Sequence, residues 1–387
     1  MQIQERLLEK PKPKVAPQTP KASDRLLSLD VFRGITLFVM CLVNNQFSPF
    51  PFLEHAAWNG MTMTDLVFPN FLFAMGFAHA IVQRKSRHSK VSYSKILRRS
   101  ALLVACGLIP NITSKILFSW PDVFKYLRFA GVLQRIGLCY FLLSTVTSIC
   151  PYLFHSSIIM TSFSLVYLFF MLFASVPNCG AGVLTPECNF GGYFDTMIWG
   201  SNHNYRKGSF DPEGLFTTLS AVLTSFLGYF LGRTVVAHKN KGFFVIIFTL
   251  LCLVFGFLFS FIIPVNKALW TTSYVFYAGF WAGVLFYCLY YIIDVWKFEK
   301  LFRIFKIMGS NSLIVFLGSS MVTLFLIYFT YNCNGSRCTF YGFPYHFFKD
   351  ILSFCPKLAS LFAGLCHSFF FLLVTFILYK KKIFIKV

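Results

Sequence analysis

Charged residues are scarce in this chain of 387 residues, and acidic residues are the scarcest of them. Only 13% of the residues are Asp, Glu, Lys or Arg, whereas a soluble protein of this length carries about a quarter. The sequence also lacks H-x-x-x-H, paired C-x-x-C, acidic-cage, Walker and dinucleotide-binding patterns. These absences argue against a soluble globular protein, and they give no support for a metal centre or a nucleotide-binding loop.

The chain is instead rich in apolar residues. Hydrophobic residues make up 56% of it, and Phe alone contributes 51 residues, which is more than a soluble core absorbs. A transmembrane helix needs about 20 mostly apolar residues. Ten such runs occur, near residues 28–46, 62–83, 96–113, 129–150, 153–176, 214–236, 243–264, 269–293, 307–330 and 358–379. The sequence therefore predicts an all-α, polytopic integral membrane helix bundle of about ten transmembrane helices in a lipid bilayer.

Lysine and arginine are distributed unevenly among the segments between these runs. The chain has 35 of them against 14 Asp and Glu, a net charge of +21. With the N-terminus in the cytosol, the cytosolic segments hold 24 basic residues and the opposite segments hold 9. The positive-inside rule therefore predicts that both termini are cytosolic. Because the basic residues form short clusters beside apolar runs, they indicate membrane flanks and not a nucleic-acid surface.

The first 27 residues differ in composition from the rest of the chain. They are polar and rich in Pro and Lys, and they lack the apolar core of a signal peptide. We interpret residues 1–27 as a disordered basic cytoplasmic tail, followed by one transmembrane domain over residues 28–387.

Four cysteines lie in loops that the charge distribution places on the non-cytosolic face. They form two closely spaced pairs, Cys179 with Cys188 and Cys333 with Cys338. Such cysteines on that face favour disulfides. Four unpaired thiols are the alternative, and the sequence leaves the pairing open.

Polar residues gather at the start of the second apolar run, in the stretch EHAAWNGMTMTDLVFPNFLFAMG. The candidates there are His55, Trp58, Asn59 and Asp65. An acid in the first turn of a helix suits the helix dipole, so a structural role explains Asp65 taken alone. Its convergence with His55 and with Asn44, at the end of the first run, indicates a functional site.

Two further groups of polar residues interrupt the apolar pattern. Arg135 follows Gln134 inside the fourth run, and an intramembrane arginine needs an acid or a phosphate as a partner. In the segment FDPEG, Asp211 is placed to cap a helix with Glu213 in its first turn. That capping role and a substrate-binding role both remain open for this segment.

These motifs, taken in order, resemble those of a known family. The sequence resembles the heparan-alpha-glucosaminide N-acetyltransferase family from about Ser28 to the C-terminus, through the motifs SLDVFRGITLFVM, HAAWNGMTMTDLVFPNFLFAMG, GVLQRIG, FDPEG, IPVNKALWTTSYV and GSNSLIVF. The resemblance implies a transmembrane acyltransferase domain that moves acetyl from cytosolic acetyl-CoA, without a metal. The acceptor is an amino sugar on the other face, such as the terminal glucosamine of a heparan-type glycan.

The resemblance also suggests roles for individual residues. The family's active-site histidine matches His55 and its nearby asparagine matches Asn44, which makes both catalytic candidates. The imidazole can take a proton from the amine or accept the acetyl group itself. We expect acceptor binding by Trp58, Asn59, Asp65, Asp211 and Glu213. We expect binding of the CoA phosphates by Arg33, Arg98, Arg99, Gln134 and Arg135.

Other functions remain open from the sequence alone. A multi-pass solute transporter would use intramembrane Asp, Arg and His equally well, and an acyltransferase could act on a different cell-envelope acceptor. The segment NQFSPFPFLE departs from the Gly-rich sequence of relatives, which bears on the shape of the acceptor pocket. The topology fits a lysosomal membrane in a eukaryote or the inner membrane of a bacterium. A homodimer is a possible assembly.

Overall fold

The computed structural model describes residues 26–85, 92–333 and 336–385, and most of these residues are helical. The α-helices are α1 (Leu27–Val43), α2 (Val67–Lys85), α3 (Tyr93–Phe118), α4 (Val132–Ile149), α5 (Leu153–Phe173), α6 (Phe190–Trp199), α7 (Thr218–Ala237), α8 (Lys241–Ser260), α9 (Thr272–Leu289), α10 (Arg303–Ser310), α11 (Ser312–Tyr328), α12 (Phe343–Ile351) and α13 (Pro356–Lys380). The predicted helical class is therefore confirmed.

Shorter elements connect these helices. The 3-10 turns are η3 (Pro51–Leu53), η4 (Thr64–Leu66), η5 (Phe124–Tyr126), η6 (Ser201–His203), η7 (Tyr205–Lys207) and η9 (Phe340–Gly342). A π-helix, η8 (Tyr290–Val295), continues α9. Strands β1 (Ser175–Val176) and β2 (Gly180–Ala181) form one antiparallel pair, and β3 (Thr330–Cys333) and β4 (Ser336–Thr339) form another.

Within the described residues, eight helices are long and apolar enough to cross a membrane. They are α2, α3, α4, α5, α7, α8, α9 with η8, and α13. The first predicted span corresponds to α1, which has 17 residues and is shorter than the length of about 20 that a span needs. The exact number of spans and the direction of the chain remain predictions.

The ninth predicted span, 307–330, is not one continuous helix. Helices α10 and α11 meet at an angle of 79°, and Asn311 lies between them with a non-helical backbone. The Asn311 side chain donates to the carbonyl of Ile383 at 3.1 Å and accepts from the amide of Ile385 at 3.1 Å. The sequence GSNS therefore breaks the helix where an amide side chain holds the C-terminal segment.

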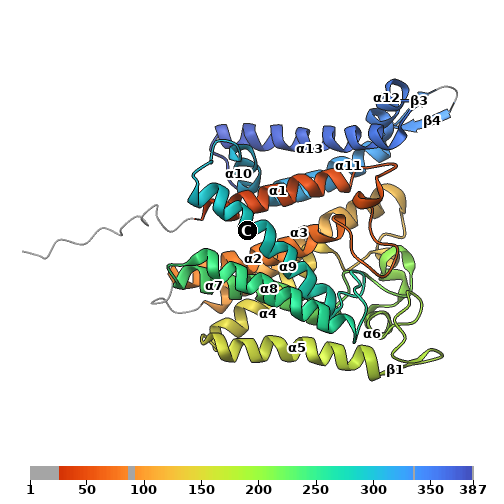
Figure 1. Ribbon diagram of the computed structural model, residues 1–387. Coiled ribbons are helices and arrows are strands. Elements are labelled where there is room, and N and C mark those ends of the chain that lie inside the picture. The colour runs from red at the N-terminus through yellow and green to blue at the C-terminus, as the bar shows by residue number, and fades with distance from the viewer. Residues whose placement is uncertain (1–25, 86–91, 334–335, 386–387) are drawn as a thin grey trace, which may run out of the picture.

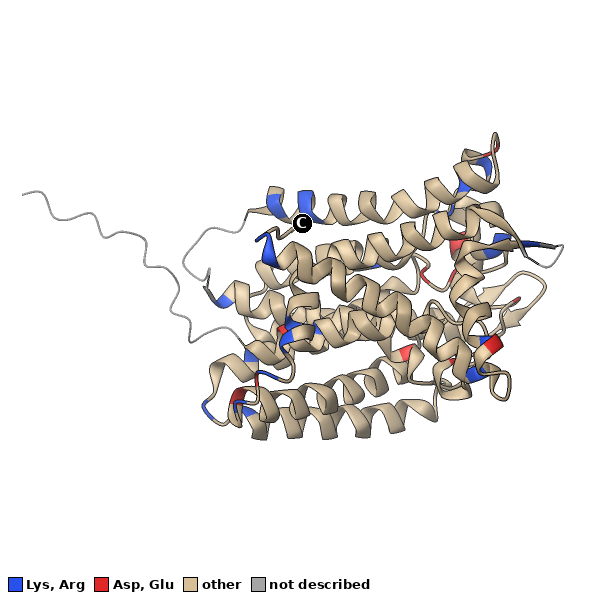
Figure 2. Cartoon of the chain, turned by 90° about the horizontal axis from the view of Figure 1, so that it is seen from above, with Lys and Arg blue, Asp and Glu red and all other residues tan. Residues whose placement is uncertain are grey.

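Most of the helices lie roughly parallel, and the two ends of the bundle differ (Figure 1). Helices α6 and α12 and both strand pairs gather at one end, while the first and last described residues lie at the other. Lys and Arg are concentrated at the end with the termini, and Asp and Glu lie mainly at the opposite end (Figure 2). We call these the basic end and the loop end. This polarity is the one that the charge count along the sequence predicts.

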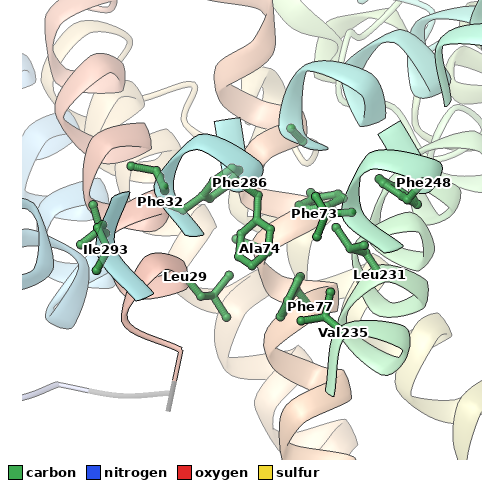
Figure 3. Packing of buried hydrophobic residues seen from close by; sticks show 14 of the residues in the cluster. Leu29, Phe32, Phe73, Ala74, Phe77, Leu231, Val235, Phe248, Phe286 and Ile293 are labelled. Carbon is green, nitrogen blue, oxygen red and sulfur yellow. The ribbon is translucent and has the colours of Figure 1, made fainter. Parts of the chain in front are cut away.

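Phenylalanine contributes more residues than any other type to one cluster in the core between the helices. Phe32 of α1, Phe73 and Phe77 of α2 and Phe286 of α9 are fully buried in one cluster (Figure 3). Helices α2 and α7 approach closely because Gly228 on α7 faces the backbone of Phe73, where a Cβ atom would overlap the Phe73 carbonyl oxygen. A small residue at such a contact lets two membrane helices pack backbone to backbone.

A disulfide joins Cys179 to Cys188 at the loop end, with their Cα atoms 5.8 Å apart. Cys338 on β4 is also disulfide-bonded. The side chain of Cys333 lies outside the described part of the structure.

Candidate active site

The candidate site is built from two loops at the loop end of the bundle. The first runs from the end of α1 to η4 and carries His55, and the second connects α8 to α9. The loops join where the amide of Gly60 donates to the carbonyl of Val265 at 2.7 Å. Gly60 has a φ of +108°, a conformation that favours glycine. Nearby, Asn266 Nδ2 donates to Asn59 Oδ1 at 3.1 Å. Asn59 thus holds the two loops together.

Asp65 lies beneath the first loop and organises it. Its side chain is 1% exposed. Its Oδ2 accepts from the backbone amides of Ala56 and Thr62, at 3.1 and 3.0 Å. The hydroxyl of Tyr274 on α9 donates to the Asp65 carbonyl at 2.6 Å. The acid therefore fixes the backbone on either side of the loop, and η4 carries it into α2.

The remaining oxygen of Asp65 faces a histidine and a lysine. His55 Nδ1 lies 2.7 Å from Asp65 Oδ1, and Lys267 Nζ lies 3.3 Å from the same oxygen and 3.1 Å from Nδ1. A carboxylate only accepts hydrogen bonds, so the neutral imidazole must carry its hydrogen on Nδ1. The lysine ammonium then pairs with the carboxylate, and the lone pair of the imidazole is on Nε2.

Exposure within this His55–Asp65–Lys267 cluster increases from the acid to the histidine. The side chain of His55 is 55% exposed, against 1% for Asp65 and 22% for Lys267. Burial lowers the pKa of Lys267, and the charges of Asp65 and Glu213 oppose that shift. A buried acid that orients an exposed imidazole is an arrangement suited to proton transfer or to nucleophilic attack.

The sequence predictions identified His55 and Asp65 but missed Lys267. Lys267 was counted only as a loop charge, although it is a single cation within the quoted motif IPVNKALWTTSYV. A cation isolated in a long apolar stretch is the signal that could have singled it out.

Trp58 lies beside the cluster and contacts the disulfide-containing loop. Its Nε1 donates to the carbonyl of Leu184 at 2.8 Å, and its ring packs edge-on against Phe210 with centroids 5.2 Å apart. This contact connects the His55 loop to the segment that carries Asp211.

A second charged cluster consists of Arg128, Asp211 and Glu213. Arg128 binds Asp211 through two hydrogen bonds, from Nε at 2.7 Å and from Nη2 at 2.5 Å, and Nη2 also contacts Glu213. Burial acts to raise the pKa of Glu213, but the charges of Arg128 and Arg135 outweigh it and hold that pKa below its usual value. The sequence analysis missed Arg128, which it counted only among the loop charges.

The capping role considered for Asp211 is wrong. Helix α7 begins at Thr218, and the residue before it, Thr217, makes no side-chain cap. Asp211 instead accepts from the amide of Glu213 at 2.9 Å while it binds Arg128. Residues 212–217 are not helical, so the Asp211 carboxylate accepts this amide within a turn and not at the start of a helix.

Residues 25–247 match the family model described as heparan-alpha-glucosaminide N-acetyltransferase, catalytic. The chain belongs to the heparan-alpha-glucosaminide N-acetyltransferase family. It is 28% identical to the mouse protein of that name over 96% of this chain, and 30% identical to the human protein over 94% of it. It spans 62% and 60% of the lengths of these two relatives. The resemblance noted from the sequence is thus confirmed.

Asn44, the second residue expected to be catalytic, forms no hydrogen bond with His55 in the part of the chain that the structure describes. Asn44 caps the end of α1 and lines a cavity of about 290 Å³ between α1, α3 and α11. The lining is rich in amides and hydroxyls, with Asn45, Asn111, Ser319 and Thr323 among them. The family's histidine and asparagine positions are therefore associated here with two separate features, an exposed imidazole and a polar cavity.

Arg135, a candidate for binding CoA, contacts the segment that follows Glu213. It is fully buried, and its Nη2 donates to the carbonyl of Gly214 at 2.9 Å and to the hydroxyl of Thr217. Its guanidinium lies 5.0 Å from the ring centre of Trp270. Gln134 beside it is also buried. These contacts place Arg135 among the polar groups at the loop end of the bundle.

The other arginines expected to bind CoA lie apart from His55. Arg33 donates to Ser312 Oγ at 2.7 Å, at the break between α10 and α11. Arg98 and Arg99 are exposed near the start of α3, and Arg99 packs over the ring of Tyr140 at 4.5 Å. Within the described ranges, no group of three or more His, Cys, Asp or Glu is arranged to hold a metal ion.

Proposed function

We propose that this chain is a transmembrane acetyltransferase that moves an acetyl group from acetyl-CoA to the amine of an amino sugar. The observation that carries the proposal is the His55–Asp65–Lys267 cluster, in a chain of the heparan-alpha-glucosaminide N-acetyltransferase family. Its imidazole is exposed, and a buried acid 2.7 Å away sets its orientation. Both features support a catalytic base or nucleophile with Nε2 as the reacting atom.

The chemistry at Nε2 follows one of two routes. In direct transfer, Nε2 takes a proton from the acceptor amine as the amine nitrogen attacks the thioester carbonyl, and the C–S bond breaks to release CoA as a thiolate. In the two-step route, Nε2 attacks the carbonyl itself, CoA leaves, and the amine then attacks the acetyl-imidazole. In both routes Asp65 holds the hydrogen on Nδ1 and stabilises the positive charge that develops on the ring.

The acceptor sugar would bind at the loop end, beside His55. Trp58 and Asn59 border the histidine through their contacts with the neighbouring loops, and we assign them to one wall of the acceptor pocket. Asp211 and Glu213 both form ion pairs with Arg128. We therefore assign them an indirect role in acceptor binding, in which they hold the guanidinium of Arg128 in place. Arg128 is 22% exposed, which leaves part of its guanidinium available to the acceptor.

The donor would enter from the basic end, which we assign to the cytosol. Acetyl-CoA carries phosphates, and Arg98 and Arg99 at the start of α3 supply cations for them. The polar cavity at Asn44 would accept the part of the donor nearest the thioester, since amides and hydroxyls line it. Gln134 and Arg135 remain candidates for the donor, although their contacts favour a role in holding residues 214–217.

Transfer of labelled acetyl tests this proposal. Purified full-length protein is mixed with labelled acetyl-CoA and glucosamine, and labelled N-acetylglucosamine is measured. We expect His55→Ala to reduce the rate by a factor of 10² or more, as loss of a catalytic base does. His346→Ala, at an exposed histidine on α12, is the matched control and should keep the native rate.

The results of this assay distinguish direct transfer from the two-step route, and both from a transporter. Label that remains on the native protein with acetyl-CoA alone, and is absent from His55→Ala, supports the two-step route. A native rate in His55→Ala would remove His55 from the mechanism. Movement of glucosamine across vesicles without acetylation would support a transporter.

A further inference from the structure

A cavity of about 470 Å³ lies at the basic end of the bundle, between the start of α8 and the π-helix η8. From α8 and the residues before it come Lys239, Lys241 and Gly242, and from η8 come Tyr290 and Tyr291. We call it the lysine–tyrosine cavity. A membrane helix rarely contains a π-helical segment, and where one occurs it frequently marks a functional site.

This cavity is remote from His55. Helix α8 runs for 20 residues from the cavity to Ser260, close to the loop that carries Lys267. At 1.5 Å per residue, α8 separates the two sites by about 30 Å, the thickness of the hydrocarbon core. The cavity therefore belongs to the opposite membrane face from the histidine, and what binds there need not take part in acetyl transfer.

The lining of the cavity is suited to a phosphate group. Among the described residues, no carboxylate forms an ion pair with Lys239 or Lys241. The acid of η8, Asp294, is engaged elsewhere, since it accepts from the amides of Leu27 and Ser28 at 3.3 Å. Two ammonium groups and two phenol hydroxyls thus provide hydrogen-bond donors, and the acid of η8 already accepts from the backbone of α1.

The cavity depends on a glycine. A Cβ atom on Gly242 would come within 2.5 Å of the hydroxyl oxygen of Tyr291. The absence of a side chain at Gly242 therefore lets the Tyr291 hydroxyl lie against the first turn of α8. A larger side chain at this position would push the Tyr291 ring out of the cavity.

Large exposed aromatic residues lie on the cavity lining or close to it in the chain, with Phe243 in the lining and Trp296 directly after the lining residue Val295. Phe243 is 59% exposed, Trp296 is 61% exposed and Phe298 is 62% exposed. Exposed aromatic rings next to basic residues are typical of the membrane–water interface, where lipid phosphates lie. A soluble phosphate compound would gain nothing from these rings, whereas a phospholipid places its acyl chains against them.

We propose that the lysine–tyrosine cavity binds the phosphate headgroup of an anionic phospholipid. Basic pockets between transmembrane helices on the cytosolic side bind such headgroups in other proteins. The bound headgroup connects α8 to η8, and η8 holds the first turn of α1 through Asp294. The lipid therefore stabilises the contact between α1, α8 and α9 at the basic end.

The test compares lipid retention and thermal stability in nanodiscs of defined composition. Full-length protein is placed in nanodiscs of phosphatidylcholine alone or with added phosphatidylglycerol, and the lipid retained after extraction is measured by native mass spectrometry. We expect phosphatidylglycerol to be retained and to raise the unfolding temperature. The double variant Lys239→Gln/Lys241→Gln should retain it at least roughly tenfold less well. Gly242→Leu should also lose retention of phosphatidylglycerol, because the leucine side chain displaces Tyr291 while the charge of the protein stays the same.

A matched control separates the cavity from the general basic surface. Lys297→Gln/Lys300→Gln removes two exposed lysines at the same end that do not line the cavity, and it should behave like the native protein. Equal loss in this control would overturn the proposal, because any basic patch would then suffice. Stabilisation by inorganic phosphate in phosphatidylcholine nanodiscs would also overturn it in favour of a soluble phosphate ligand. Neither readout uses acetyl transfer, so this result is independent of the proposed enzymatic function.

Discussion

Replacement of Asp65 by asparagine keeps the shape of the side chain at position 65 but should move the hydrogen of the His55 imidazole from Nδ1 to Nε2. Asp65 Oδ2 accepts from two backbone amides, and these donors cannot change. The single oxygen of an asparagine must therefore face them, and its NH₂ group then faces His55 Nδ1. The imidazole can accept from that group only if its hydrogen moves to Nε2. The lone pair needed for catalysis then no longer lies on Nε2.

The size of this effect follows from the geometry. Loss of the correct tautomer at a catalytic histidine lowers kcat by a factor of about 10²–10⁴. The protein also loses a charge-assisted hydrogen bond and the ion pair with Lys267, which should cost about 1.5–3 kcal/mol of stability. We expect a folded protein that melts at a lower temperature and transfers almost no acetyl.

The assay measures acetyl transfer to glucosamine and the unfolding temperature on the same purified sample. Asp122→Asn, at an exposed acid between α3 and α4, is the matched control and should be native in both measurements. If Asp65→Asn folds and retains a rate close to the native one, Asp65 does not set the tautomer of His55 and the arrangement proposed for the site is wrong.

Three further predictions concern other loop-end residues. Burial raises the pKa of Asp195 to about 7, from a usual value near 4; the folded state then binds more protons across that range, so stability should fall as pH rises from about 4 to about 7. Asp195→Asn should weaken this pH dependence of the unfolding temperature, and parallel curves would contradict the reasoning. Lys267→Met removes the cation that lies 3.3 Å from Asp65 Oδ1 and leaves the buried carboxylate without its ion-pair partner, so the unfolding temperature should fall; an unchanged unfolding temperature would mean that this ion pair does not stabilise the site. The double variant Cys179→Ser/Cys188→Ser removes the disulfide that closes a short loop, and the free energy of unfolding should fall by about 2–3 kcal/mol. Its unfolding temperature should be lower than that of the native protein and similar to that of the native protein after reduction.

The sequence predicted the long apolar helices of the fold because each of them has its own local signal. Apolar runs of sufficient length predicted α8 near residues 243–264, and the structure has it at Lys241–Ser260. The closeness of His55 and Asp65 was also accessible, since only ten residues separate them. Both predictions depend on residues close together in the chain.

Contacts between distant segments were not predictable in the same way. Lys267 reaches His55 across 212 positions, and Arg128 reaches Asp211 across 83. No periodicity or spacing encodes such pairs. The helix that Asp211 was expected to cap begins only at Thr218, and Asn311 binds the C-terminal segment at the break in a predicted span.

The prediction for Arg135 shows how much an isolated polar residue reveals. An arginine inside an apolar run indicated an acid or a phosphate as its partner, and in the structure the side chain contacts Gly214, Thr217 and the face of Trp270. A backbone carbonyl and an aromatic ring are partners that no sequence pattern identifies. The need for a partner was predictable from the cost of burying a charge, but its identity was not.

Acetyl transfer across a sealed membrane tests the central claim most directly. Vesicles are prepared with the basic end outward, glucosamine is trapped inside, and acetyl-CoA labelled in either the acetyl group or the CoA is added outside. The proposed function predicts labelled N-acetylglucosamine inside the vesicles and no labelled CoA inside. Label that appears only on an external amine would contradict the arrangement of donor and acceptor on opposite faces, and no acetylation of either amine would contradict the acetyltransferase function itself.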